Sequence, residues 1–120
     1  MYNMGAGSLQ KMYVKESLQN EGEGFVFKIK NLIDSGSISG VKKILVDDEE
    51  RPVEGVTIEM GGKVRQANQI TWSTSVYVGY GSVMTIFVPG ALEPGEHTIK
   101  VQVSVPELGM LTLPVTDTVA

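Results

Sequence analysis

Residues 99–105 read Ile-Lys-Val-Gln-Val-Ser-Val, and this stretch decides the fold class of the chain. Its apolar residues alternate strictly with lysine, glutamine and serine. Because successive side chains of a β-strand point to opposite faces, this pattern predicts a strand with one buried face and one wet face. Phe25, Phe27 and Ile29 repeat the same period, with Val26, Lys28 and Lys30 on the opposite face. Both stretches therefore favour antiparallel β structure.

The composition supports the same fold class. Valine, isoleucine and threonine together outnumber alanine and leucine by more than two to one. Branching at Cβ suits a pleated sheet and restricts rotamers in a helix. The 14 glycines and 5 prolines divide the chain into short segments. We expect further strands at residues 11–18, 41–47, 56–60, 63–66, 83–88 and 111–119, with Gly61-Gly62 as a two-residue hairpin turn between 56–60 and 63–66. We also expect the start of another strand at 70–72, a loop or one short helical turn at 32–40, and a loop at 72–81.

Eight to ten short strands without a long helix predict an all-β fold, an antiparallel β-sandwich or jelly-roll-like single domain. An immunoglobulin-type domain is the alternative, but the chain lacks the cysteine pair of antibody domains and its loops are irregularly spaced. The 120 residues are too few for two domains. We expect a loosely ordered N-terminal segment at residues 1–10 and the β-sandwich at residues 11–120.

Charge and cysteine content exclude several classes of function. The formal net charge of −4 and the isoelectric point near 4.9 give no basic surface for nucleic acid or anionic lipid. Without cysteine, the chain has no disulfide, thiolate nucleophile or iron–sulfur ligand. The first thirty residues carry lysines and glutamates and no long apolar run. We therefore expect neither a signal peptide nor a membrane span, and a cytoplasmic location.

The polar residues do not form a recognisable active site. His97 is the single histidine, and its setting in Pro-Gly-Glu-His at the entry to a strand favours an exposed or hydrogen-bonded turn residue. Glu96 would point to the opposite face of a strand, which weakens an acid–base pair. The acidic run at residues 47–50 is typical of a solvated hairpin tip, since it lacks the oxygen spacing and glycine of a calcium loop. We predict no catalytic residue and no metal site on this chain.

Aromatic residues provide the candidate site. Trp72, Tyr77 and Tyr80 fall in a stretch that also contains small polar residues and the glycines Gly79 and Gly81. Tryptophan and tyrosine are enriched where proteins contact other proteins. We expect Tyr77 and Tyr80 to lie at a partner interface. For Trp72, the interface and the core of the sandwich are equally compatible with the sequence.

The order of several segments resembles a known family. These are Tyr13-Val14-Lys15-Glu16-Ser17-Leu18, Ser39-Gly40-Val41-Lys42-Lys43-Ile44, Ile70-Thr71-Trp72, the strand from Val83 to Val88, and Pro89-Gly90-Ala91-Leu92-Glu93-Pro94-Gly95-Glu96-His97 before an alternating valine strand. Together they resemble the small β-subunit family of C-glycoside deglycosidases, over roughly residues 11 to 105.

The resemblance implies a function for a complex rather than for this chain alone. Members of that family pair with a larger TIM-barrel α subunit. The pair cleaves the carbon–carbon bond between a 3-oxo sugar and an isoflavone- or flavone-type aglycone. A divalent metal, manganese, and the base would lie on the α subunit, so the isolated β subunit would be inactive. No cofactor is implied on this chain.

Two other functions stay open at this point. The chain could be a carbohydrate-binding or adhesion-like β-sandwich that uses its aromatic residues as a platform for sugars. It could also be a scaffold domain of a cytoplasmic complex. The resemblance favours the lyase subunit, with the 3-oxo-C-glycoside bound at the complex.

Overall fold

The structure is a computed structural model that describes residues 9–120. It confirms the all-β prediction, since its strands pair antiparallel throughout the described chain. The strands are β1 (Gln19–Glu21), β2 (Gly24–Lys30), β3 (Gly36–Ile38), β4 (Gly40–Val46), β5 (Glu49–Arg51), β6 (Thr57–Met60), β7 (Lys63–Gln66), β8 (Val76–Val78), β9 (Val83–Pro89), β10 (Gly95–Val105) and β11 (Gly109–Val119). Two 3₁₀ turns, η1 (Ala67–Gln69) and η2 (Trp72–Thr74), lie between β7 and β8.

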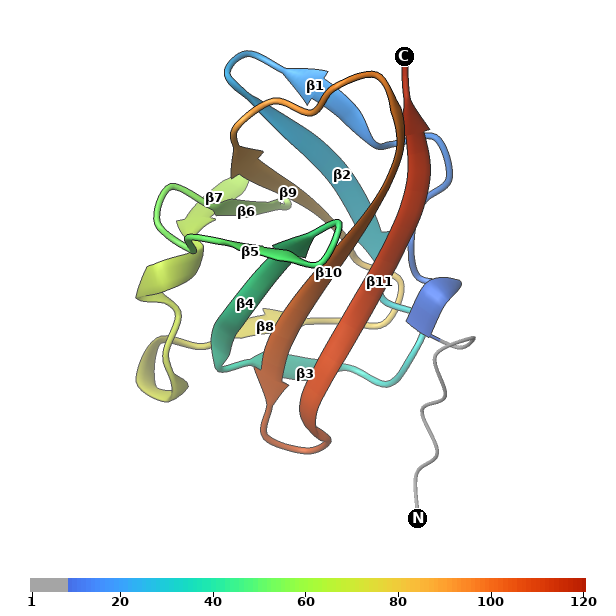
Figure 1. The fold of residues 1–120 in the computed structure, drawn as a ribbon. Helices are drawn as coiled ribbons and strands as arrows, with labels where there is room; N and C mark the ends of the chain where they lie inside the picture. The colour runs from blue at the N-terminus through green and yellow to red at the C-terminus, as the bar shows by residue number, and fades with distance from the viewer. Residues whose placement is uncertain (1–8) are drawn as a thin grey trace.

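The strands form two facing sheets and a short ribbon (Figure 1). Sheet I has the order β1-β2-β9-β6-β7, and sheet II has the order β11-β10-β4-β5. The pair β3–β8, here called the end ribbon, lies across the lower end of the sandwich in Figure 1. Each sheet has one apolar face, and burying both faces against each other is what produces the sandwich.

Alternating side chains form the core, as the sequence predicts. From Ile99 onward every second residue of β10 is buried, whereas the residues between them, such as Lys100, are partly exposed. In β2, Phe25 and Phe27 are fully buried with their ring centroids 6.1 Å apart. The fully buried side chains come from both sheets and the segment before β6: Phe25, Phe27, Ile29, Ile44, Ile99, Val56, Val88, Val101 and Val115.

Two predicted turns take the expected form. Gly61 and Gly62 join β6 to β7 with φ values of 60° and 83°, the two positive angles that a type I′ hairpin needs. Asp47 and Asp48 of the acidic run form the tip of the β4–β5 hairpin, both with positive φ, and Glu49 and Glu50 begin β5. Pro114 lies in β11 at the edge of sheet II. An edge strand tolerates proline because no further strand needs the N–H group that proline lacks.

The predicted strand at residues 11–18 is wrong. This segment pairs with β2 only around the Tyr13–Ile29 bridge, through Val14 N–H to Lys28 O at 2.9 Å and Lys30 N–H to Met12 O at 2.7 Å. The chain then leaves sheet I at Glu16, which has a positive φ of 69°. The Tyr13 hydroxyl and the Glu16 N–H donate to Asp117 Oδ2 instead, which ties the segment to β11.

The predicted loops at 32–40 and 72–81 each contain a strand of the end ribbon, β3 and β8. They pair with Ser37 opposite Tyr77. The strand expected to begin at residues 70–72 is also wrong, because the chain there passes from η1 into η2. Strands of three residues are too short for an alternating pattern to be recognised in the sequence. In the structure, the paired β3 and β8 cover the open end of the core.

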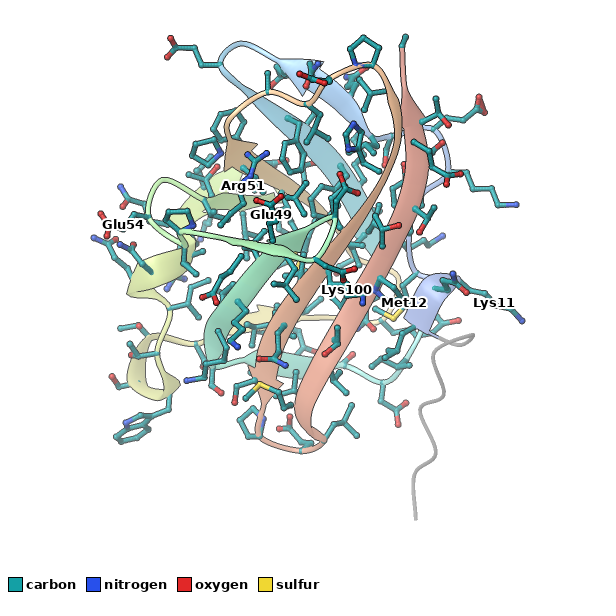
Figure 2. The ribbon with its side chains drawn as sticks, in the orientation of Figure 1. Lys11, Met12, Glu49, Arg51, Glu54 and Lys100 are labelled. Atoms are coloured by element: carbon teal, nitrogen blue, oxygen red, sulfur yellow. The ribbon has the colours of Figure 1, made fainter. Side chains whose placement is uncertain are left out.

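The expected N-terminal segment lies mostly outside the described residues. Residues 1–8 are not described, and the described chain begins at Leu9, whose side chain is buried. Figure 2 shows Lys11 extending away from the strands while Met12 turns toward them. Met12 is buried in the core.

Candidate functional site

The exposed aromatic side chains of the described chain lie together in sequence around β8. Trp72 is 84% exposed, Tyr77 65% and Tyr80 68%. A core position for Trp72, one of the two possibilities left open by the sequence, is therefore wrong. Tryptophan and tyrosine offer a large contact area and are enriched where proteins meet partners. We call these three residues the aromatic face.

Different elements position the three side chains. Tyr77 is the outward residue of β8, because Val76 and Val78 on either side of it point into the core. Tyr80 follows β8 in a turn, where its N–H donates to Ser35 Oγ at 2.9 Å. Trp72 precedes β8 on η2, so Trp72 and Tyr80 lie at opposite ends of this strand.

Hydrogen bonds fix the turn that carries Trp72. Thr71 and Thr74 form a capping box around η2, with Thr71 N–H donating to Thr74 Oγ1 at 3.0 Å. The Thr74 hydroxyl donates to Gln69 O, and Arg65 of β7 donates to Thr74 O, each at 2.8 Å. This turn is therefore held in one conformation before any partner binds, which lowers the entropy cost of binding.

His97, the one imidazole, is committed to the fold. It lies in β10, with Nδ1 2.7 Å from Asp47 Oδ2 and Nε2 2.7 Å from Glu93 O. The hydrogen bonds to the Asp47 carboxylate and then to the Glu93 carbonyl raise the pKa of His97 above its ordinary value. The pKa of Asp47 is lowered, first by the Thr98 N–H and then by His97. Both ring nitrogens face acceptors, so neither is free to take a proton from a substrate.

A second polar cluster also serves the fold. Asp117 accepts the Tyr13 hydroxyl at 2.8 Å and the N–H groups of Glu16 and Thr118. The Thr118 N–H, the Tyr13 hydroxyl and the Glu16 N–H lower the pKa of Asp117. Burial, and then the hydrogen bond to Asp117, raise the pKa of Tyr13. Among residues 9–120, no group of three or more His, Cys, Asp and Glu side chains is placed to hold a metal ion.

Comparison with known proteins corrects the family suggested by the sequence. The family model described as hydroxymethylglutaryl-CoA reductase, N-terminal domain, matches residues 8–120. The assignment to the C-glycoside deglycosidase β subunits is therefore wrong, and so is the predicted function as a subunit of a carbon–carbon lyase. No curated protein matches the chain.

The structure explains why the motif behind that resemblance is a poor guide to function. Leu92 is buried, Gly95 has a φ of 126°, and His97 bonds across to Asp47. The segment from Pro89 to His97 therefore satisfies the geometry of a turn between two strands. Unrelated sandwiches need the same geometry.

The described chain has no helix with the length and apolar character needed to cross a bilayer.

The family match spans nearly the whole chain, including every strand of both sheets and the end ribbon. The family takes its name from a domain of an enzyme, a reductase. This chain belongs to the family of hydroxymethylglutaryl-CoA reductase N-terminal domains.

Proposed function

We propose that this chain is a non-catalytic docking module that binds the catalytic part of a hydroxymethylglutaryl-CoA reductase through the aromatic face. The exposure of Trp72, Tyr77 and Tyr80 carries the proposal. Aromatic side chains of this kind supply much of the binding free energy in protein interfaces. The interface expected from the sequence thus stays a proposal, with a reductase in place of the TIM-barrel α subunit.

The rigidity of the aromatic face supports a docking role. The capping box of η2 and the hydrogen bond from Arg65 hold the turn of Trp72, and the pairing of β8 with β3 holds Tyr77. A partner that covers these side chains therefore orders little backbone. Such preorganisation leaves more of the contact energy as affinity.

The polar side chains support a role outside the chemistry. His97 and Asp47 bond to each other, and Tyr13 and Asp117 bond to each other, both across elements of the sandwich. These four residues stabilise the fold through bonds that a proton-transfer role would have to break. In our proposal the partner supplies the catalytic groups and any cofactor.

The test measures binding to the catalytic part of hydroxymethylglutaryl-CoA reductase from the same source by isothermal titration calorimetry. We expect Tyr77→Ala with Tyr80→Ala to weaken binding by about 2 kcal/mol or more, or roughly thirtyfold. Met110→Ala is the matched control, since Met110 is 53% exposed on β11 and lies outside the aromatic face. That control should bind like the unchanged chain.

Two results would overturn the proposal. One is the absence of binding at high micromolar concentrations of both proteins. The other is equal affinity for the double variant and the Met110→Ala control. Saturable binding of an oligosaccharide to the aromatic face, with no binding of the reductase, would point instead to a carbohydrate-binding module. Thermal unfolding of each variant checks that a loss of affinity does not come from a loss of fold.

A further inference from the structure

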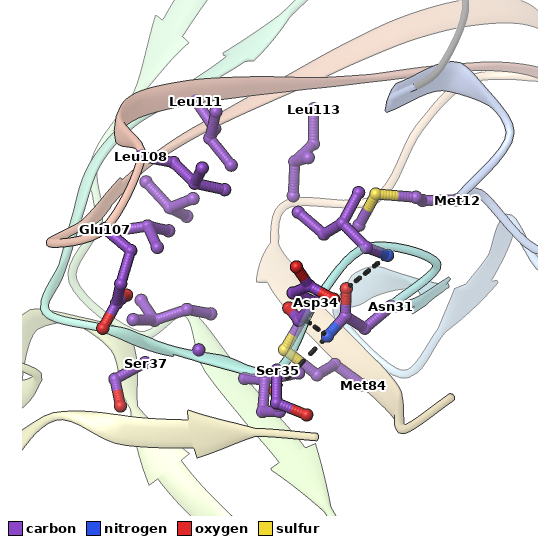
Figure 3. Close-up of a pocket in the computed structure, with 16 residues that line it drawn as sticks. Met12, Asn31, Asp34, Ser35, Ser37, Met84, Glu107, Leu108, Leu111 and Leu113 are labelled. Carbon is purple, nitrogen blue, oxygen red and sulfur yellow. Dashed lines mark hydrogen bonds between the residues drawn. The ribbon is translucent and has the colours of Figure 1, made fainter. Parts of the chain in front are cut away.

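An apolar pocket of about 260 Å³ opens between the two sheets beside the end ribbon (Figure 3). Leu108, Leu111 and Leu113 line one side, and Met12 and Met84 line the other. Methionine side chains are flexible and polarisable, so they adapt to apolar ligands of irregular shape. The pocket faces the interior of the sandwich, whereas the aromatic face points outward.

One wall of the pocket lacks a side chain at Gly36 in β3. The φ of Gly36 lies outside the left-handed region, so its backbone does not require glycine. A Cβ added there would lie 3.3 Å from Glu107 Oε1 and 3.7 Å from Val105 Cγ1, and both residues line the pocket. A side chain at this position would therefore press against Glu107 and narrow the pocket.

Asn31 holds the loop that forms another wall. Its side chain is buried, and Nδ2 donates to the carbonyls of Val78 and Gly79 at 3.3 and 3.2 Å. Its Oδ1 accepts the Ile33 N–H at 3.0 Å (Figure 3). Both polar atoms of the amide therefore bond to the backbone. Asn31 shapes the pocket by holding this loop.

The polar side chains at the pocket have one sign of charge. Asp34 and Glu107 are exposed carboxylates from opposite sides of the lining, and Ser35 and Ser37 add hydroxyl groups. None of the described lining residues is lysine, arginine or histidine. The lining therefore favours a cationic head group over a neutral one and disfavours an anionic one.

We propose that this pocket binds a small linear aliphatic amine, with the alkyl chain inside and the ammonium group attracted by the negative charge of Asp34 and Glu107. A volume of 260 Å³ equals roughly nine waters at about 30 Å³ each. An alkylammonium with a chain of roughly six carbons has a comparable size. The residues involved differ from the aromatic face, so this proposal stands independently of the docking function.

The test uses hexylammonium, hexanol and hexanoate as probes, added to the full chain labelled with ¹³C at its methionine methyls. We expect hexylammonium to shift the Met12 and Met84 signals in a saturable way, while Met110, outside the pocket, stays unchanged. Hexylammonium should bind about twofold to fivefold tighter than hexanol, which is the range for exposed charge pairs, and hexanoate should bind more weakly than hexanol. Added salt should reduce these differences.

Two glycine variants test the location. Gly36→Val should fill the space beside Val105 and weaken all binding by at least about tenfold, a loss expected when a side chain occupies the site. Gly79→Ala is the matched control. Gly79 also has a φ outside the left-handed region and follows β8, but its added Cβ would make only ordinary contacts, with Ser82 Oγ at 3.5 Å as the nearest atom.

Charge variants keep the proposal testable if Gly36→Val fails to fold. Asp34 and Glu107 are exposed, so Asp34→Asn with Glu107→Gln should fold normally. This double variant should lose the preference for hexylammonium over hexanol and bind hexanol unchanged. The proposal is overturned if no probe shifts Met12 and Met84, if hexanoate binds tightest, or if the double variant keeps the preference for the ammonium.

Discussion

His97 Nδ1 lies 2.7 Å from Asp47 Oδ2, and this contact joins β10 to the turn between β4 and β5. The other ring nitrogen lies 2.7 Å from Glu93 O. Two acceptors around one imidazole require both nitrogens to carry protons, so the folded state favours the imidazolium form. The turn from Glu93 to His97 and the β4–β5 hairpin are therefore linked through one imidazole.

This arrangement makes stability depend on pH in a defined direction. The pKa of His97 is raised in the folded state, so its contribution is complete below the ordinary value of about 6.5. As the pH rises through that value, the unfolded chain loses its proton first, and the free energy of unfolding falls. The contribution is lost above the folded pKa. Urea unfolding at several pH values measures this, and the ¹H NMR titration of the single imidazole gives the folded pKa.

Asp47→Asn is the control for this prediction. It removes the carboxylate partner, so the folded pKa of His97 should move toward 6.5 and the fall in stability on raising the pH should shrink. An unchanged imidazole pKa in this variant would show that Asp47 does not set the charge state of His97.

Asn31 should be far more sensitive to substitution than its position in a loop would suggest, because its side chain is buried. In Asn31→Asp an oxygen replaces Nδ2 and faces the carbonyls of Val78 and Gly79. We expect a loss of more than about 2 kcal/mol in the free energy of unfolding, because buried acceptors lose their donor and a charge is buried. Chemical denaturation measures the loss.

Asn20→Asp is the matched control for Asn31. Asn20 also bonds to the backbone, since its Nδ2 donates to Leu92 O and its Oδ1 accepts the Leu92 N–H, each at 2.8 Å. Unlike Asn31, however, Asn20 is exposed. It should lose only about 0.5–1.5 kcal/mol. Equal losses at the two sites would contradict the burial argument.

Two aromatic truncations should separate the core from the aromatic face. Phe27→Ala removes a fully buried ring and should cost about 3–5 kcal/mol of stability. Tyr77→Ala removes an exposed ring and should change stability by no more than about 0.5 kcal/mol. Thermal and urea unfolding of the isolated chain measure both. A large loss in Tyr77→Ala would mean that Tyr77 supports the end ribbon.

Strands and turns with a strong local signal could be predicted from the sequence. The alternation at residues 99–105 identified β10, and Gly61-Gly62 identified the β6–β7 hairpin, because both signals arise from neighbouring residues. The end ribbon could not be predicted this way. β3 and β8 have three residues each, and they pair across about forty positions of sequence, as Ser37 does with Tyr77.

The candidate site was predictable only in part. The aromatic residues were visible in the sequence, but the exposure of Trp72 depends on η2, which forms through contacts with Gln69 and Arg65. The pocket was missed. Its walls come from Met12, Met84 and Leu111, which no local pattern connects. The family assignment was wrong because the residues before His97 form a turn that connects two strands. Such a turn carries no information about activity.

The docking proposal can be tested most directly at Trp72, the one tryptophan in the sequence. The chain is labelled with 5-fluorotryptophan, and its single ¹⁹F signal is followed while the unlabelled catalytic part of hydroxymethylglutaryl-CoA reductase is added. We predict a saturable shift of this signal and loss of its H₂O/D₂O isotope shift, because the partner covers a side chain that is 84% exposed. A signal that keeps its position and full isotope shift at saturating partner would contradict the docking proposal.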